Sequence, residues 1–455
     1  MNLSFFRDKD FIRRMLSLAI PVAFQQFITA ALNMVDVLMV GQLGETSIAA
    51  LGLANQIFFL YILFLFGVTS GTAIFSAQYW GKNDEESIRK VLGISLSIAM
   101  LVGTLFTLAA TLIPETLLRF YTADPEVIAL ASGYLRIVGL SYLFTAIVTS
   151  YHAIYRSITM VKLTVSISVT ALILKAILGY MLIFGIGGLP ALGVRGAAIA
   201  TAFGWVLQFV LISILTYTLK TPLAANPLTF FDFDRAFLVK VLKTAMPAAI
   251  NEVAWSIGIT TYNAVYAHIS TGAIAAVQIN ATIEEIAFVL FIGLGNACAI
   301  MIGNEIGAGE QDMAFEHSRR YLIIIILMAL LSGGLILLIR EPVISLYNIS
   351  DEVAFSAYRL MTVFALTAWL RSINFILFIG ALRAGGDTKF AMFMEIFSIW
   401  TIGVPAALIG GFVLHLPVHG VYLMVLSEEA VKAIIISKRY RSRKWIHDLA
   451  TVASV

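Results

Sequence analysis

The chain has 455 residues, of which 60% are hydrophobic and 13% are charged, and its mean hydropathy is +0.92. A water-soluble domain carries about 25% charged residues, so this composition predicts an integral membrane protein whose excess apolar surface is covered by lipid. The formal net charge of +3 is too small to indicate nucleic-acid binding, and the single cysteine, Cys298, excludes an internal disulfide.

Apolar stretches long enough to cross a bilayer follow one another along the chain. The first comes after the charged stretch FFRDKDFIRR and is too long for a signal-peptide core, so we expect it to be retained as a helix. The sequence predicts an all-α, polytopic membrane protein with twelve transmembrane helices. They are expected at 15–40, 48–80, 90–113, 126–155, 163–185, 194–218, 245–267, 274–305, 321–339, 352–382, 389–414 and 420–437.

Lysines and arginines are distributed unequally between alternate loops. If the N-terminus is cytoplasmic, the cytoplasmic loops hold most of them, Arg156 included, and the opposite loops hold only Arg119, Arg195 and Arg340. The positive-inside rule then places both termini in the cytoplasm and requires an even number of spans. We therefore expect a multi-pass protein of the plasma (inner) membrane.

The second half of the chain repeats the first with a period of about 226 residues. Pro21 in LAIPVAFQQ aligns with Pro247 in TAMPAAINE, and Arg156 aligns with Arg383 at a period of 227. Six helices per half is an even number, so the halves share one orientation. We expect two six-helix bundles related by an axis along the membrane normal.

This repeat predicts the domain organisation. An N-terminal six-helix lobe is expected at 1–220 and a C-terminal six-helix lobe with a basic cytoplasmic tail at 241–455. Between them, 221–240 contains the polar stretch TPLAANPLTFFDFDR and is expected to be a cytoplasmic linker.

Motifs in both halves together resemble one transporter family. They are MVDVLMVGQLG, IAALGLANQ, LPALGVRGAAIAT, IGNEIGAGE, FIGALRAGGDTK and KRYRSRKW. The whole chain resembles the multidrug and toxic compound extrusion (MATE) transporters. This resemblance implies a V-shaped pair of six-helix bundles that exports small organic, mainly cationic or amphipathic, drugs and metabolites in exchange for protons or sodium ions.

Few ionisable residues lie within the predicted spans, where each is costly and usually faces a cavity or a partner. Asp36, in NMVDVLMVG, matches the acid that the family uses in its first lobe for cation or proton binding. Lys175 is a candidate partner for Asp36. The family's archaeal sodium-site pattern has Asn and Asp where this chain has Lys175 and Gly179, so sodium binding by Asp36 is disfavoured.

In the second half, Glu252 matches the glutamate that drug-exporting branches of the family carry on their seventh helix, and its repeat counterpart is Gln26. The family's partner acid on the tenth helix is replaced by Ser372, beside Arg371. Any metal site is unknown; Asp36 or Glu252 would hold sodium if the chain is sodium-coupled. Titration of single acids is favoured over a two-carboxylate sodium cage.

Other acids in the second half are weaker candidates. Glu284 and Glu285 are adjacent on a helix and point about 100° apart, so at most one can face the same side of a cavity as Glu252. The alternative is that one of them forms a hydrogen bond to a neighbouring helix. Glu428 and Glu429 have the spacing for intrahelical pairs with Lys432, and this pairing is as well supported as a transport role. Arg136, Arg371 and Glu395 are further intramembrane candidates.

No motif for phosphate binding, metalloprotease activity or a catalytic triad is present, so we expect a transporter and not an enzyme, with no cofactor apart from the coupling ion. The expected partners are small organic cations or drugs and the lipid bilayer, without nucleic acid, and the chain is expected to act as a monomer. The leading hypothesis is secondary antiport. The alternative is a flippase for lipid-linked precursors, which would need a cationic cavity.

Overall fold

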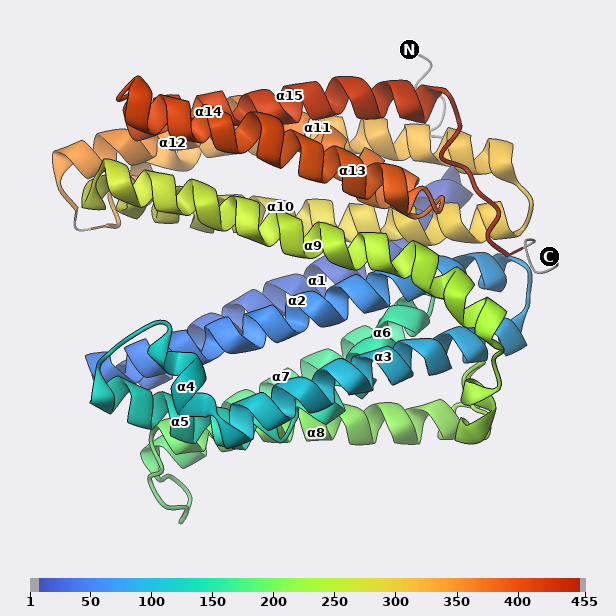
Figure 1. The fold of residues 1–455 in the computed structure, drawn as a ribbon, viewed down its shortest axis with the longest axis horizontal. Coiled ribbons are helices and arrows are strands. Elements are labelled where there is room, and N and C mark those ends of the chain that lie inside the picture. Colours follow the sequence, from blue (N-terminus) through green and yellow to red (C-terminus); the bar gives the residue numbers. More distant parts are fainter. Residues whose placement is uncertain (1–7, 348, 451–455) are drawn as a thin grey trace. The chain divides into compact units, whose positions relative to one another are not determined.

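The computed structural model describes residues 8–347 and 349–450, and within these residues the chain is helical and has no β-strand (Figure 1). This confirms the all-α prediction. The residues form two compact units. The first unit is Phe24–Ala249, and the second unit contains the described residues before Phe24 together with those from Ile250 onward.

The helices up to α9 supply the first unit, apart from the beginning of α1 and the end of α9. They are α1 (Lys9–Gly41), α2 (Glu45–Gly81), α3 (Glu85–Leu112), α4 (Pro114–Arg119), α5 (Pro125–Gly139), α6 (Tyr142–Ser157), α7 (Val161–Phe184), α8 (Val194–Thr218), the short 3₁₀ helix η2 (Pro227–Phe231) and α9 (Arg235–Ile269).

The second unit contains the later helices, and three of its segments are π-helical. The helices are α10 (Thr271–Gly307), α11 (Gln311–Ile344), α12 (Asp351–Phe375), η3 (Ile376–Arg383), α13 (Thr388–Ser398), η4 (Ile399–Gly403), α14 (Val404–Leu408), η5 (Ile409–Val413) and α15 (Val418–Arg441), with η3, η4 and η5 being π-helical.

The number of membrane spans agrees with the prediction. In the described part of the chain, nine helical segments are long and apolar enough to cross a bilayer, and α5 with α6 forms a tenth span bent by 54°. Helices α9 and α15 have 35 and 24 residues, which exceeds the roughly 20 needed to cross the hydrocarbon layer. These two helices are less apolar because they carry more polar and charged residues. Counting them with the other ten spans gives twelve.

The predicted boundaries differ from the structure at several places, among them the start of α11, which lies at Gln311 and not at the expected 321. The helix expected at 126–155 is broken between α5 and α6, where Leu140 and Ser141 separate them. Helix α9 begins at Arg235, ahead of the expected 245, so its first turns occupy the end of the segment expected as a linker. The rest of that segment is packed: the Phe230 side chain is buried, and Arg89 Nε donates to the Pro222 carbonyl at 2.8 Å.

Helix ends coincide with residues that can satisfy free backbone groups. The Asp84 carboxylate accepts a hydrogen bond from the Ser87 amide at the start of α3, and the Ser270 hydroxyl accepts one from the Ala273 amide at the start of α10. Helix α7 ends at Gly185, whose φ of 72° is left-handed. Glycine is the residue that adopts this conformation without strain.

The internal repeat is also present in the packing of each unit. In the first unit, Gly67 of α2 lies against the backbone of Ala249 in α9. In the second unit, Gly293 of α10 lies against Ala23 of α1, and both members of this pair are the repeat counterparts of the first. A Cβ at Gly67 would collide with Ala249, and a Cβ at Gly293 would collide with the Ala19 carbonyl oxygen and be tight against Ala23. These small residues therefore permit close approach of the helices.

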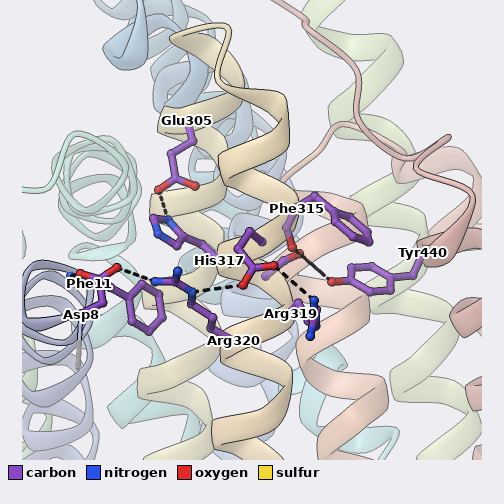
Figure 2. A network of polar contacts seen from close by, with 10 residues as sticks. Asp8, Phe11, Glu305, Phe315, His317, Arg319, Arg320 and Tyr440 are labelled. Atoms are coloured by element: carbon purple, nitrogen blue, oxygen red, sulfur yellow. Dashed lines mark hydrogen bonds and ion pairs between the residues drawn. The ribbon is translucent and has the colours of Figure 1, made fainter. Parts of the chain in front are cut away.

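The start of α1 is tied to α11 within the second unit by a polar network (Figure 2). Arg320 donates through Nη1 to Asp8 Oδ2 at 2.6 Å, and the buried Phe11 ring packs 4.9 Å from the His317 ring. The hydrogen bond from the Phe11 amide and then that from Arg320 lower the pKa of Asp8. His317 Nδ1 lies 2.6 Å from Glu305 Oε1, which links α11 to α10.

Candidate functional site

The first unit contains a cavity of about 820 Å³ between α1, α2, α5, α6, α7 and α8. This volume is in the range of sites for drug-sized molecules. Its charged lining residues are Asp36, Lys175 and Arg156, and aromatic rings of Phe58, Phe59 and Trp205 also line it. The remaining polar lining includes the side chains of Gln25, Gln26, Asn33, Asn55, Gln56, Thr149, His152, Ser168, Thr201 and Gln208.

The acid and lysine singled out in the first half form an ion pair in this cavity. Lys175 Nζ of α7 lies 2.5 Å from Asp36 Oδ2 of α1, and the two side chains are 16% and 25% exposed. The lysine ammonium therefore neutralises Asp36 and takes the position beside the carboxylate that a sodium ion would need.

Arg156 was expected in a cytoplasmic loop, but its side chain lines the cavity. It lies in the last turn of α6, one helical turn after His152, and both side chains line the cavity. Among the residues that the structure describes, the Arg156 side chain has no hydrogen-bond or ion-pair partner, and the buried His152 Nε2 also has none. The i, i+4 spacing of two basic residues was a signal that could have identified this pair.

In the second unit, Glu252 of α9 is paired with Arg383. Arg383 Nη1 donates to Glu252 Oε1 at 2.8 Å, and the Arg383 side chain is only 5% exposed. Arg383 ends the π-helical segment η3, and its Nη2 is buried without a hydrogen-bond partner in the described structure. Arg383 lies just beyond the helix expected at 352–382, and in the structure it is the counter-ion of Glu252.

Glu284 turns toward neighbouring helices and is not paired with Glu252. Its Oε2 accepts a hydrogen bond from Arg371 of α12 at 2.6 Å, and its Oε1 accepts bonds from Tyr422 of α15 and Asn280 of α10. Glu285, the adjacent residue, is exposed. The two side chains thus have different surroundings, as their helical spacing predicts. Glu284 makes hydrogen bonds to neighbouring helices, which was the alternative to a role in the cavity.

A larger acidic group, which we call the Lys432 cluster, lies in the interior of the second unit. Lys432 Nζ is 3.0 Å from Glu428 Oε1, 3.2 Å from Glu395 Oε1 and 3.7 Å from Glu429 Oε1. Glu428 and Lys432 are buried, and the Glu429 side chain is 19% exposed. The intrahelical pairing predicted for Lys432 is present, but the contribution of Glu395 from α13 was not predicted.

Two uncharged side chains complete the Lys432 cluster. Tyr262 of α9 donates its hydroxyl to Glu428 Oε2 at 2.5 Å, and Asn374 of α12 donates Nδ2 to Glu429 Oε2 at 2.5 Å. Gly403 at the end of η4 lies directly against Tyr262 and Glu428, where a Cβ would collide with both. The π-helical turn and this glycine thus make room for the hydrogen bond between α9 and α15.

A family model described as MatE matches this chain at residues 21–181 and again at 247–409. The two matches correspond to the two halves of the repeat. Because together they cover more than half of the chain, they establish its family and confirm the resemblance found in the sequence.

Relatives match along nearly the full length. The uncharacterized transporter YisQ of Bacillus subtilis is 26% identical over 444 residues, which cover 96% of each chain. The multidrug resistance protein PmpM of Pseudomonas aeruginosa is 25% identical and covers 87% of this chain and 83% of its own. The multidrug resistance protein MdtK of Edwardsiella ictaluri is 27% identical and covers 86% of both.

Solved structures show the same fold. A multidrug resistance MATE family transporter of the MOP superfamily matches with a TM-score of 0.84 at 21% identity, covering 95% of this chain and 96% of its own. A MOP superfamily transporter from Pyrococcus furiosus also has a TM-score of 0.84, at 20% identity, covering 97% and 96%. With a family match in both halves, relatives along its length and twelve apolar or amphipathic spans, the chain belongs to the MatE family of multi-pass membrane multidrug efflux transporters.

Proposed function

We propose that this chain is a secondary antiporter of the plasma membrane that exports small amphipathic organic compounds in exchange for protons. The observation that carries the proton coupling is the Lys432 cluster. Three carboxylates there share one ammonium group, so full ionisation would leave two uncompensated negative charges in the interior of the second unit. Such charges are strongly disfavoured in a low-dielectric interior, and bound protons remove them.

The other groups around the cluster do not balance this excess. Tyr262 and Asn374 are neutral donors, and Tyr266 is a neutral electrostatic neighbour of Glu428. Arg371 is close enough to interact with Glu429, but its guanidinium is bonded to Glu284, and that pair is neutral as a whole. Glu429 is the most exposed carboxylate of the cluster and lies farthest from Lys432. We therefore choose Glu429 as the position at which to test the cluster.

Sodium coupling is less well supported by the surroundings of the two acids considered for it. Asp36 is in contact with Lys175, and Glu252 is in contact with Arg383. Sodium prefers several oxygen ligands, and a cationic side chain at bonding distance repels it.

The cargo class rests on the cavity and on the relatives. A volume of about 820 Å³ with aromatic and amide lining suits an amphipathic organic molecule, and relatives along most of the chain are multidrug resistance proteins. One chain supplies both halves, so we propose that the monomer transports.

Purified protein in proteoliposomes, with ethidium as a permanently cationic probe, tests this function. We expect transport to follow an imposed pH gradient at equal sodium concentration, and Glu429→Gln to reduce that transport at least tenfold. The exposed Glu126→Gln is the matched control and should transport at the wild-type rate. Transport that follows a sodium gradient at clamped pH and ignores the pH gradient would contradict proton coupling.

The flippase for lipid-linked precursors remains the second candidate, because Arg156 gives the first-unit cavity one cation in excess. The same proteoliposomes distinguish the two functions. A flippase would move a fluorescent polyprenyl pyrophosphate between leaflets and would leave ethidium untransported, whereas the antiporter is expected to do the reverse.

A further inference from the structure

Arg156 is the one charged residue of the first-unit cavity for which the described structure provides no counter-ion. Among the described residues, Asp36 is the only acidic one that lines the cavity, and its carboxylate is bonded to Lys175. The cavity lining therefore carries one negative and two positive side chains. Since the guanidinium stays charged at all physiological pH values, the cavity keeps a positive excess whatever the protonation of His152.

The internal repeat shows what this arginine lacks. Its counterpart Arg383 in the second unit is bonded to Glu252 at 2.8 Å. The counterpart of Glu252 in the first half is Gln26, and both Gln26 and Arg156 line the cavity. The first half thus keeps the arginine of the pair and replaces its carboxylate by a neutral amide. The cavity occupies the place where the second half has a closed ion pair.

The surroundings of Arg156 are those of a polar binding site. His152 lies one turn earlier on α6, is 8% exposed and has Nε2 buried without a partner in the described residues. Further along the lining, Gln25 Nε2 donates to Ser168 Oγ at 3.0 Å, which orders polar groups from α1 and α7. These groups can donate or accept hydrogen bonds, but none of them neutralises a guanidinium.

We propose that Arg156 and His152 form a subsite for an anionic group of the cargo, so that this transporter accepts zwitterionic amphipathic compounds bearing a carboxylate. Burying a charge without a partner is unfavourable, and a carboxylate bound by the guanidinium fork would remove that cost with two charge-assisted hydrogen bonds. This inference rests on the proposed export function and adds that one end of the substrate is negatively charged.

A matched pair of dyes isolates the carboxylate. Rhodamine 110 carries a free carboxylate, and rhodamine 123 is its methyl ester, so the two share one cationic ring system. Binding to wild-type and variant protein in lipid nanodiscs is followed by fluorescence anisotropy. We expect Arg156→Gln to weaken rhodamine 110 binding at least tenfold, in the range of one lost charge-assisted contact, and to change rhodamine 123 binding less than twofold.

A second variant tests the same site by adding a group. Gln26→Glu supplies the acid that the second half has at the equivalent position, which should neutralise Arg156 and also weaken rhodamine 110 binding at least tenfold. Arg136→Gln is the control, because Arg136 is half-exposed, pairs with Glu115 and does not line the cavity. Unchanged rhodamine 110 affinity in the two cavity variants, equal losses for both dyes, or no binding of rhodamine 110 to wild type would overturn the proposal.

The measurement is independent of ion coupling. Equilibrium binding needs no gradient, so a protein that fails to antiport protons can still show the carboxylate preference. Retained rhodamine 123 binding by Arg156→Gln reports that the variant is folded, and if that variant does not fold, Gln26→Glu decides the outcome alone.

Discussion

At Glu252, the buried Arg383 side chain changes the expected effect of neutralising the acid. Glu252→Gln keeps the size of the side chain but leaves the Arg383 guanidinium, only 5% exposed, without its counter-ion. Breaking a buried ion pair in this way costs about 3 to 5 kcal/mol. We therefore expect the single variant to lose export and also to be less abundant in the membrane.

The double variant Glu252→Gln/Arg383→Gln separates these two effects. It removes both charges, so we expect its membrane abundance to recover toward wild type while export, measured as ethidium efflux from cells, stays below a tenth of the wild-type rate. Near-normal efflux by a well-expressed double variant would show that the pair serves only the fold.

Individual acids could be predicted from the sequence, but most of their partners could not. Asp36 and Glu252 stand out because charges are rare in apolar segments, and the pairing of Asp36 with Lys175 was considered on the same ground. Arg156 and Arg383 lie at helix ends, where a shift of two to four residues moves a side chain from a loop into a cavity or a buried ion pair. Tertiary packing determines where each helix ends, and this packing cannot be read from a single sequence.

At the level of helices, the residues after η3 are held to the C-terminal end of α15 by Asp387. Arg439 Nε donates to Asp387 Oδ2 at 2.7 Å, and the Trp445 ring, fully buried, packs against Gly385. Burial alone would raise the pKa of Asp387, but the hydrogen bonds from His447 and Arg439 outweigh it and lower the pKa.

This lowered pKa predicts a pH-dependent contribution to stability. A carboxylate whose folded-state pKa is depressed stabilises the fold above its unfolded pKa of about 3.9 and loses that effect as the pH falls through the folded value. We expect Asp387→Asn to lower the Tm at pH 5, and the difference from wild type to shrink below pH 4. A difference that is already lost at pH 5 would contradict this assignment.

Helix positions were predicted well where apolar runs end in charges or glycine, as for α7 and α8. The break between α5 and α6 was missed because Leu140 and Ser141 carry no strong helix-breaking signal. The π-helical segments were missed for a similar reason. Their extra residue per turn is stabilised by local contacts such as that of Gly403 with Tyr262, which depend on the folded unit.

Over the whole molecule, the repeat keeps the packing of the two halves alike and makes their chemistry different. The Gly67–Ala249 and Gly293–Ala23 contacts are equivalent by the repeat. Within the described residues, the first half has Gln26 and an Arg156 without a counter-ion, where the second half has the ion pair of Glu252 with Arg383. We infer that the halves divide the work of transport, with cargo recognition in the first and proton exchange in the second.

The loop charges predict the orientation of the whole chain in the membrane, and cysteine labelling can test this prediction. Cys298 is the only cysteine and is fully buried, so wild-type protein should resist a membrane-impermeant maleimide and serves as the background control. Phe120 is 83% exposed beside Arg119, and Leu228 is 77% exposed in η2. With both termini cytoplasmic, Phe120→Cys should be labelled on intact cells and Leu228→Cys only after permeabilisation. The reverse pattern would invert the topology and assign the cation-rich loops to the outside, against the positive-inside rule.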